Sequence, residues 1–163
     1  FTQFPASLGG PFDDVVLGAD AVDYAAELVA VIGRRAERVH AGDGWEHVAG
    51  LAVGQDISDR TLQFAAGAQF SLGKSRRGYA PMGPWLVTPD EFDDPDDLAL
   101  TCSVDGEVMQ DARTADLIFD VPRLIAILSA EILMVVGAST ALAGVLTAIV
   151  SRYGMLVLQL VTG

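Results

Sequence analysis

DYAAELVAVIG (residues 23–33) and VAGLAVGQDISDRTLQ (residues 48–63) decide the fold of this chain. Their short apolar runs, bounded by glycine and polar residues, predict two strands, Asp23–Gly33 and Gly50–Asp56. Each strand carries one carboxylate among apolar neighbours, Glu27 in the first and Asp56 in the second. Burying a charge without compensation is very costly, so each carboxylate requires a partner or a metal ion.

The first strand places Glu27 on the same face as Ala25, Val29 and Val31, because side chains two residues apart in a strand point to the same side. Ala25 stands where a second carboxylate would lie beside Glu27, and it offers only a methyl group. The retained pair of carboxylates and this absence are the most informative features of the sequence.

Length and composition bound the class of protein. The chain has 163 residues, enough for one domain with a substantial core, and its hydrophobic content of 51% argues against disorder. The formal net charge of −12 argues against nucleic acid as a partner, because phosphate backbones would be repelled. Cys102 is the only cysteine, so neither an internal disulfide nor a cysteine-based metal site is available. No signal peptide is visible, and we expect a cytoplasmic protein.

One window raises the question of a membrane span. The twenty uncharged residues ILMVVGASTALAGVLTAIVS (132–151) are long enough to cross a bilayer. Glycine, serine and threonine divide them into two short apolar runs, and neither a Lys/Arg cluster nor an aromatic belt flanks them. We therefore predict no membrane partner.

Short elements are predicted between and after the two strands. The patterns indicate a short strand at Val15–Leu17, a helix from Asp43 through Val48 with a capping box, a helical turn at Asp59–Ala66, a loop over Gln69–Gly83 and a short strand at Pro84–Thr88. Arg34, Arg35 and Arg38 predict a solvated turn. His40 and His47 lack a third nearby ligand and do not indicate a metal site.

The clearest local signal is a hairpin in LALTCSVDGEVMQDAR (98–113), where Asp105-Gly106 suits a type I′ turn. Asp120 predicts the N-cap of a helix that continues to about Ser129, with a proline in its first turn. Gly154–Val161 predicts a last strand. The order mixes strands with few helices, so the predicted class is α+β, mainly β.

These segments together resemble the fumarylacetoacetate hydrolase family over nearly the whole chain. The resemblance is carried by FPASLGGPFDDVVL, ELVAVIGRRAERV, HVAGLAVGQDISDRTLQ, GKS followed by APMGPWLVTPDE, VDGEVMQDARTADLIFDVPRLIAILS and, more weakly, YGMLVLQLVTG. It implies a mixed β roll and usually a homodimer. It also implies magnesium- or manganese-dependent enzymes that act on 2-oxo acids and 1,3-dicarbonyl compounds by C–C hydrolysis, decarboxylation or isomerisation.

The resemblance implies a metal site that is incomplete here. The family supplies Glu-x-Glu on one strand and Asp on the next as ligands, and these positions hold Ala25, Glu27 and Asp56 in this chain. Magnesium can be held by one or two carboxylates plus substrate oxygens, so binding is weakened and not forbidden. We predict either no cofactor or weakly bound Mg²⁺ or Mn²⁺.

Other positions of the implied site are kept. Arg60 and Gln63 match substrate-binding positions of the family, and Lys74 matches its active-site lysine. We predict that Lys74 is catalytic and that all three bind substrate. The alternatives are a surface salt bridge for Arg60 and a surface position for Lys74.

Several departures remove a ligand or make the site less polar. Gln3 replaces a lysine of the family's entry segment, Arg76-Arg77 replaces an aromatic residue and an acid, and Ser139–Leu142 stands where a Thr-Gly-Thr-Pro loop is usual. The upstream segment that carries the family's catalytic histidine and an acid is not in this sequence. We therefore predict one domain over residues 1–163 that lacks its N-terminal segment.

Three functions remain open at this point. We predict a diverged family member, an isomerase or cyclase that acts without a bound metal on a bulky apolar keto or enol small molecule. The apolar stretch Ile132–Val150 would wall its cavity, although it equally suits the core or a dimer interface. The alternatives are a Mg- or Mn-dependent hydrolase, decarboxylase or isomerase of 2-oxo acids or 1,3-dicarbonyls, and a non-catalytic binding homologue.

Overall fold

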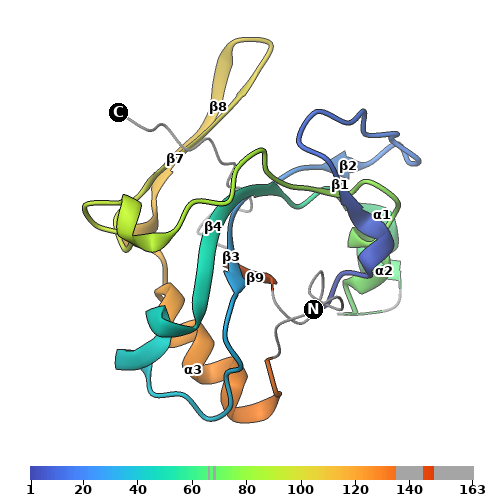
Figure 1. Ribbon diagram of the computed structural model, residues 1–163. Coiled ribbons are helices and arrows are strands. Elements are labelled where there is room, and N and C mark those ends of the chain that lie inside the picture. Colours follow the sequence, from blue (N-terminus) through green and yellow to red (C-terminus); the bar gives the residue numbers. More distant parts are fainter. Residues whose placement is uncertain (66, 68, 135–144, 149–163) are drawn as a thin grey trace.

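A three-stranded antiparallel sheet of order β4-β3-β9 forms the centre of the fold (Figure 1). β3 (Ala26–Ile32) lies in the middle, with β4 (Val48–Gln55) and β9 (Val145–Ala148) on either side. The computed structural model describes residues 1–65, 67, 69–134 and 145–148. The strand predicted at Gly50–Asp56 is confirmed as β4 with shifted bounds. The strand predicted at Asp23–Gly33 is confirmed only from Ala26 to Ile32, because Asp23 belongs to a separate short strand and Ala25 to none.

β3 is buried on both of its faces. Ala26, Leu28, Ala30 and Ile32 contribute to the main hydrophobic core. The opposite face carries the buried side chains of Glu27 and Val29, and Ala25, directly before the strand, is buried as well. The carboxylate of Glu27 on this second face is therefore removed from water.

The main core lies between β3, the hairpin of β7 (Ala99–Val104) and β8 (Glu107–Arg113), and the helix α3 (Val121–Glu131). Cys102 is one of its buried apolar residues, as predicted. In Figure 1 the hairpin projects at the top of the molecule, and α3 lies at the bottom beside the 3₁₀ helix η2 (Ala41–His47).

The predicted hairpin turn and helix cap are both confirmed. Asp105 has φ 53° and Gly106 has φ 85°, the pair of left-handed conformations that a type I′ turn requires. The Asp120 side chain accepts a hydrogen bond of 2.7 Å from the backbone N–H of Arg123. α3 continues two residues beyond the predicted end at Ser129.

Short elements surround the sheet and carry the candidate site. They are η1 (Pro5–Ser7), β1 (Leu8–Gly9), β2 (Val22–Asp23), β5 (Ser58–Asp59), α1 (Arg60–Ala65), α2 (Ser71–Lys74), β6 (Ala80–Pro81), η3 (Pro89–Glu91) and η4 (Thr114–Asp116). β1 pairs with β6 in parallel, and β2 pairs with β5 antiparallel. The predicted helical turn corresponds to α1, whereas the loop predicted over Gln69–Gly83 contains α2 and β6.

Three predicted elements are wrong. Val15–Leu17 forms no strand within the described chain, and Val16 and Leu17 are exposed. The helix predicted from Asp43 is a 3₁₀ helix that begins at Ala41, because His40 and not Asp43 is its N-cap residue. Pro84–Thr88 makes only an isolated bridge between Val87 and Leu51, since the proline has no N–H to donate to a ladder.

Some predictions lie outside the described residues. These are the last strand at Gly154–Val161, the replaced loop at Ser139–Leu142 and most of the apolar stretch Ile132–Val150. Within the described chain, α3 ends at Glu131 and no helix is long and apolar enough to cross a membrane. The class is α+β with more strand than helix, as predicted.

Candidate active site

The two predicted carboxylates come from neighbouring strands. Glu27 lies on β3, and Asp56 directly follows β4, where it exchanges backbone hydrogen bonds of 3.1 and 2.7 Å with Ala25. Gly54 stands opposite Glu27 in the register. A Cβ at Gly54 would lie 2.7 Å from Cγ2 of Val29, so only glycine leaves room for the side chains of this face.

Glu27 is buried with unsatisfied hydrogen-bonding capacity. Its exposed fraction is 2%, and neither carboxyl oxygen has a hydrogen-bond partner among the described residues. Burial raises the pKa of the Glu27 carboxyl well above its ordinary value, the nearby Asp56 carboxylate raises it further, and the Lys74 ammonium partly opposes both effects. The group therefore needs a proton or a cation to be stable where it lies.

Lys74 is buried in direct contact with Asp56. Its Nζ donates hydrogen bonds to Oδ2 of Asp56 and, over 2.8 Å, to Oγ of Ser58. The surface position considered for Lys74 is therefore wrong. Burial raises the pKa of the Asp56 carboxyl, and the charges of Lys74 and then Arg60 oppose that rise.

The N-terminal segment closes over this ion pair. Nε2 of Gln3 donates to Oδ1 of Asp56 over 3.2 Å and to the backbone oxygen of Lys74 over 3.0 Å. The ring of Phe1 lies 4.7 Å from the Lys74 Nζ. Sequence reasoning noted Gln3 only as a replacement and missed these contacts, as it missed Ser58 within the ISDRTLQ segment. For Ser58 the available signal was its place in a segment that carries the family resemblance, and for Gln3 it was a position directly before such a segment.

Arg60 and Gln63 are brought together at the start of α1. Nη1 of Arg60 donates to Oε1 of Gln63 over 2.8 Å, and its Nη2 and Nε donate to Oδ2 of Asp23 over 2.6 and 2.9 Å. Gln63 is buried and the Arg60 side chain is 30% exposed. Arg60 is therefore a half-buried, partnered cation whose charge reaches Asp56. No hydrogen bond or ion pair joins Arg60 or Gln63 to Lys74 within the described chain.

A third ion pair, between Asp59 and Arg76, lies at the start of α1. Oδ1 of Asp59 accepts the backbone N–H of Leu62 over 2.9 Å, which caps the first turn of the helix. Oδ2 of Asp59 pairs with Nη2 of Arg76 over 2.8 Å. Arg76, a departure from the family pattern, thus has a structural partner at the base of α1.

Glu27 and Asp56 are the two residues of this site that could contribute ligands to a divalent cation. Two carboxylates, Glu27 and Asp56, are close enough to interact, and the Glu27 oxygens have no other described partner. No group of three histidine, cysteine or acidic residues in the described ranges could hold a metal ion. An ion here would take its remaining ligands from water or substrate, as Mg²⁺ commonly does.

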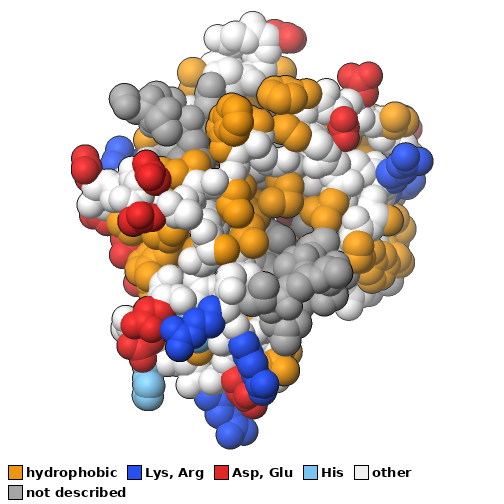
Figure 2. Space-filling model, in the orientation of Figure 1, with side chains coloured by type: hydrophobic (Ala, Val, Ile, Leu, Met, Phe, Trp, Pro, Cys, Tyr) orange, Lys and Arg blue, Asp and Glu red, His pale blue; other side chains and the backbone are white. Residues whose placement is uncertain are grey.

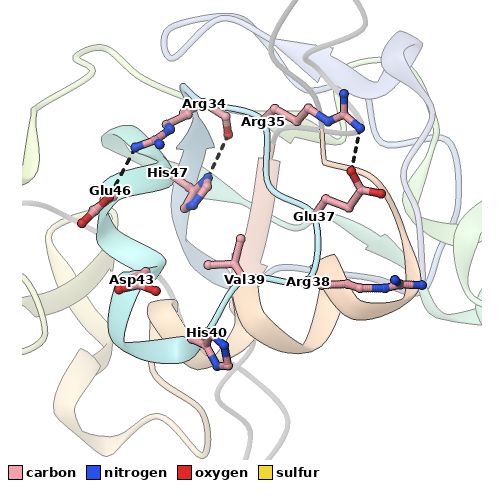
Figure 3. A pocket seen from close by; sticks show the side chains of 9 residues that line it. All are labelled: Arg34, Arg35, Glu37, Arg38, Val39, His40, Asp43, Glu46 and His47. Carbon is pink, nitrogen blue, oxygen red and sulfur yellow. Dashed lines mark hydrogen bonds and ion pairs between the residues drawn. The ribbon is translucent and has the colours of Figure 1, made fainter.

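A separate depression of about 350 Å³ lies beyond the other end of β3. Figure 3 shows Arg34 directed at Glu46 and Arg35 at Glu37, while Arg38 points away from both. The arginines are exposed, as the predicted solvated turn requires. None of the predicted site residues lines this depression.

Comparisons with known proteins agree on one family. The model of the family described as fumarylacetoacetate (FAA) hydrolase C-terminal matches residues 1–138. The chain is 40% identical over 128 residues to the mitochondrial oxaloacetate tautomerase FAHD2A of Bos taurus, covering 77% of this chain and 41% of that protein. It is 40% identical over 139 residues to 2,4-didehydro-3-deoxy-L-rhamnonate hydrolase of a Sphingomonas strain, covering 84% and 49%.

The chain is also similar to a solved structure. The 5-carboxymethyl-2-hydroxymuconate delta-isomerase of Mycobacterium smegmatis superposes with a TM-score of 0.76 at 34% identity, covering 82% of this chain and 52% of that one. The chain thus spans less than half the length of these two curated relatives and about half of this structure.

Proposed function

The chain belongs to the fumarylacetoacetate hydrolase family, and on that premise we propose that it acts as an enzyme of isomerase or hydrolase type on a small keto–enol molecule. The similar proteins named as a tautomerase, an isomerase and a hydrolase support this class of reaction. We favour an isomerase or tautomerase whose substrate carries an apolar part.

The observation that carries the proposal is the buried Lys74–Asp56–Ser58 cluster beside Glu27. A buried ammonium held by a carboxylate and a hydroxyl is a fixed cationic donor in a place shielded from water. Such preorganised donors stabilise negative charge that develops on an oxygen during reaction. Keto–enol interconversion develops that charge on the carbonyl oxygen.

The residues of the chain have distinct roles in this proposal. Nζ of Lys74 would donate to the enolate oxygen, and the Ser58 hydroxyl, which already accepts from Nζ, keeps its own hydrogen for the same oxygen. Arg60 presents a guanidinium, fixed by Asp23 and Gln63, that suits a carboxylate of the substrate. Gln3 would keep the Asp56 carboxylate in place.

A second candidate is a metal-dependent hydrolase, decarboxylase or isomerase of 2-oxo acids. It is favoured by one observation, the unpartnered Glu27 carboxyl beside Asp56. Glu27 and Asp56 would hold a magnesium or manganese ion, which when bound polarises a carbonyl oxygen. Lys74, Ser58 and Arg60 would keep the binding roles described above.

The test is a spectroscopic assay of keto–enol interconversion with oxaloacetate and with an acylpyruvate, each in EDTA and in added Mg²⁺ or Mn²⁺. We expect turnover in EDTA, and we expect Lys74→Met to abolish it. Arg113→Met is the control and should leave turnover unchanged, because Arg113 is exposed and pairs with Asp97. Turnover only with added metal would favour the second candidate. No turnover under any condition would contradict both and indicate a binding homologue.

A further inference from the structure

Three phenylalanine rings lie in a row beside the Lys74 ammonium. The Phe1 ring is 4.7 Å from Nζ, its centroid is 6.5 Å from that of Phe70 at an angle of 55°, and the Phe70 centroid is 5.7 Å from that of Phe64 at 76°. The rings come from the N-terminal segment, from α1 and from the residue before α2. They make a continuous apolar path from the buried ammonium to the surface.

Two of these rings, Phe1 and Phe64, are exposed, and Phe70 between them is half-buried. Phe1 is 51% exposed and Phe64 is 61% exposed, whereas the main core is built from β3, β7 and α3. Figure 2 shows apolar side chains gathered at the right of the molecule, over α1 and α2. Contiguous exposed apolar side chains commonly mark a binding site.

The position of the rings indicates which chemical groups a ligand would need in order to bind along them. One end of the row is the cationic donor that the proposed function assigns to the keto–enol head. The other end is an edge-to-face aromatic pair on the surface, which offers ring faces and edges to a further aromatic or alkenyl group. A ligand with a polar head and a flat apolar tail matches both ends.

We propose that Phe1, Phe70 and Phe64 form a subsite for the aromatic or alkenyl tail of the substrate, and that this subsite selects aryl 2-oxo acids over short ones. The inference rests on the proposed function for the position of the head. The rings remove apolar tail surface from water, and Phe1 marks the boundary between tail and head.

The test compares a ligand with a tail to one without. Calorimetric titration with phenylpyruvate and with oxalate is carried out on the parent protein, on Phe64→Ala and on Phe12→Ala. Alanine is compatible with α1, and Phe12 is a control because it is 86% exposed and lies on a different segment. Phe64→Ala should weaken phenylpyruvate binding about five- to tenfold and leave oxalate binding unchanged, because one aromatic contact is lost. Phe12→Ala should change neither.

The outcomes separate the two hypotheses. Suppose that the parent binds oxalate, and that the parent and Phe64→Ala bind phenylpyruvate with equal affinity. This result overturns the proposed subsite and leaves the proposed function standing. Absence of oxalate binding to the parent counts against the proposed function, and the phenylpyruvate comparison then still decides the subsite. Phe70→Leu gives a second variant that keeps apolar volume, and it should weaken phenylpyruvate binding to a smaller extent.

Discussion

Lys74 is the only lysine of the chain, and it is buried against Asp56 and Ser58. Lys74→Met should therefore destabilise the fold by about 3–5 kcal/mol, because the substitution leaves the Asp56 carboxylate buried without its cation. Urea unfolding of the parent and the variant in EDTA measures this difference. The double variant Asp56→Asn/Lys74→Met should lose less than the sum of the single variants. A cost below about 1 kcal/mol for Lys74→Met would show that the pair is open to water.

Ala25 bears on metal affinity, because it exchanges backbone hydrogen bonds with Asp56 and lies two residues before Glu27. Ala25→Glu would add a third carboxylate at this point. We expect the variant to bind Mn²⁺ more tightly than the parent by at least about tenfold, since added ligand charge strengthens the binding of a hard cation. Isothermal titration with Mn²⁺ tests this. Micromolar binding by the parent would show that another group already replaces the missing ligand.

Asp59 predicts a specific dependence of stability on pH. Its pKa is held below the ordinary value, chiefly because the carboxylate accepts the Leu62 N–H, with the Arg76 ion pair contributing. A lowered folded-state pKa means that the carboxylate stabilises the fold above the pKa of the unfolded chain, and that this contribution is lost as pH falls through the folded pKa.

Asp59→Asn keeps a good N-cap side chain but removes the charge. The parent should be more stable than the variant at neutral pH, and the difference should shrink as pH falls below about 4, the ordinary aspartate pKa. Urea unfolding at several pH values gives the two curves. A difference that stays constant into acid would assign the effect to packing and not to the charge of Asp59.

At the scale of the element, the β7–β8 hairpin depends on its turn. Gly106 has φ 85°, a conformation that costs an L-residue about 1–2 kcal/mol, so Gly106→Ala should lower the free energy of unfolding by about that amount. Gly42→Ala is the control, because a Cβ there would meet no described atom within 4 Å. Chemical denaturation of both variants decides the matter. Equal losses would mean that the turn is not specifically required.

The elements that were predicted correctly are those with a strong local cause. The hairpin turn and the α3 cap depend on neighbouring residues, so Asp105-Gly106 and Asp120 were sufficient to place them. Val15–Leu17 and Pro84–Thr88 have strand-like residues, but a strand requires a partner, and pairing is set by the tertiary structure. The 3₁₀ helix η2 likewise begins at Ala41 and not at Asp43, so the capping pattern alone did not fix its bounds.

The sequence predicted which residues belong to the candidate site, but it did not predict the contacts between them. The strand period and the family resemblance identified Glu27, Asp56 and Lys74. The approach of Gln3 to Asp56 spans 53 residues of sequence, and no local pattern encodes such a contact. The row of phenylalanine rings was missed for the same reason, because its members come from three separate segments.

At the scale of the whole molecule, large apolar side chains remain exposed on one chain, among them Phe12, Trp85 and Ile118. The homodimer that the family resemblance implies stays a prediction, and an interface of standard size would cover about 800 Å² on each chain. Light scattering after size exclusion should give about twice the 17.1 kDa of one chain. A monomeric mass at micromolar concentration would contradict the prediction.

The order of the central sheet also has a consequence for biosynthesis. β3 pairs with β4, which follows soon after it, but its other edge pairs with β9, about 110 residues later in the chain. At a translation rate of about 5–20 residues per second, the ribosome releases β3 roughly 5–20 s before its second partner exists. During that interval an apolar strand presents open backbone groups to solvent, which is the stage at which a nascent chain most needs a chaperone.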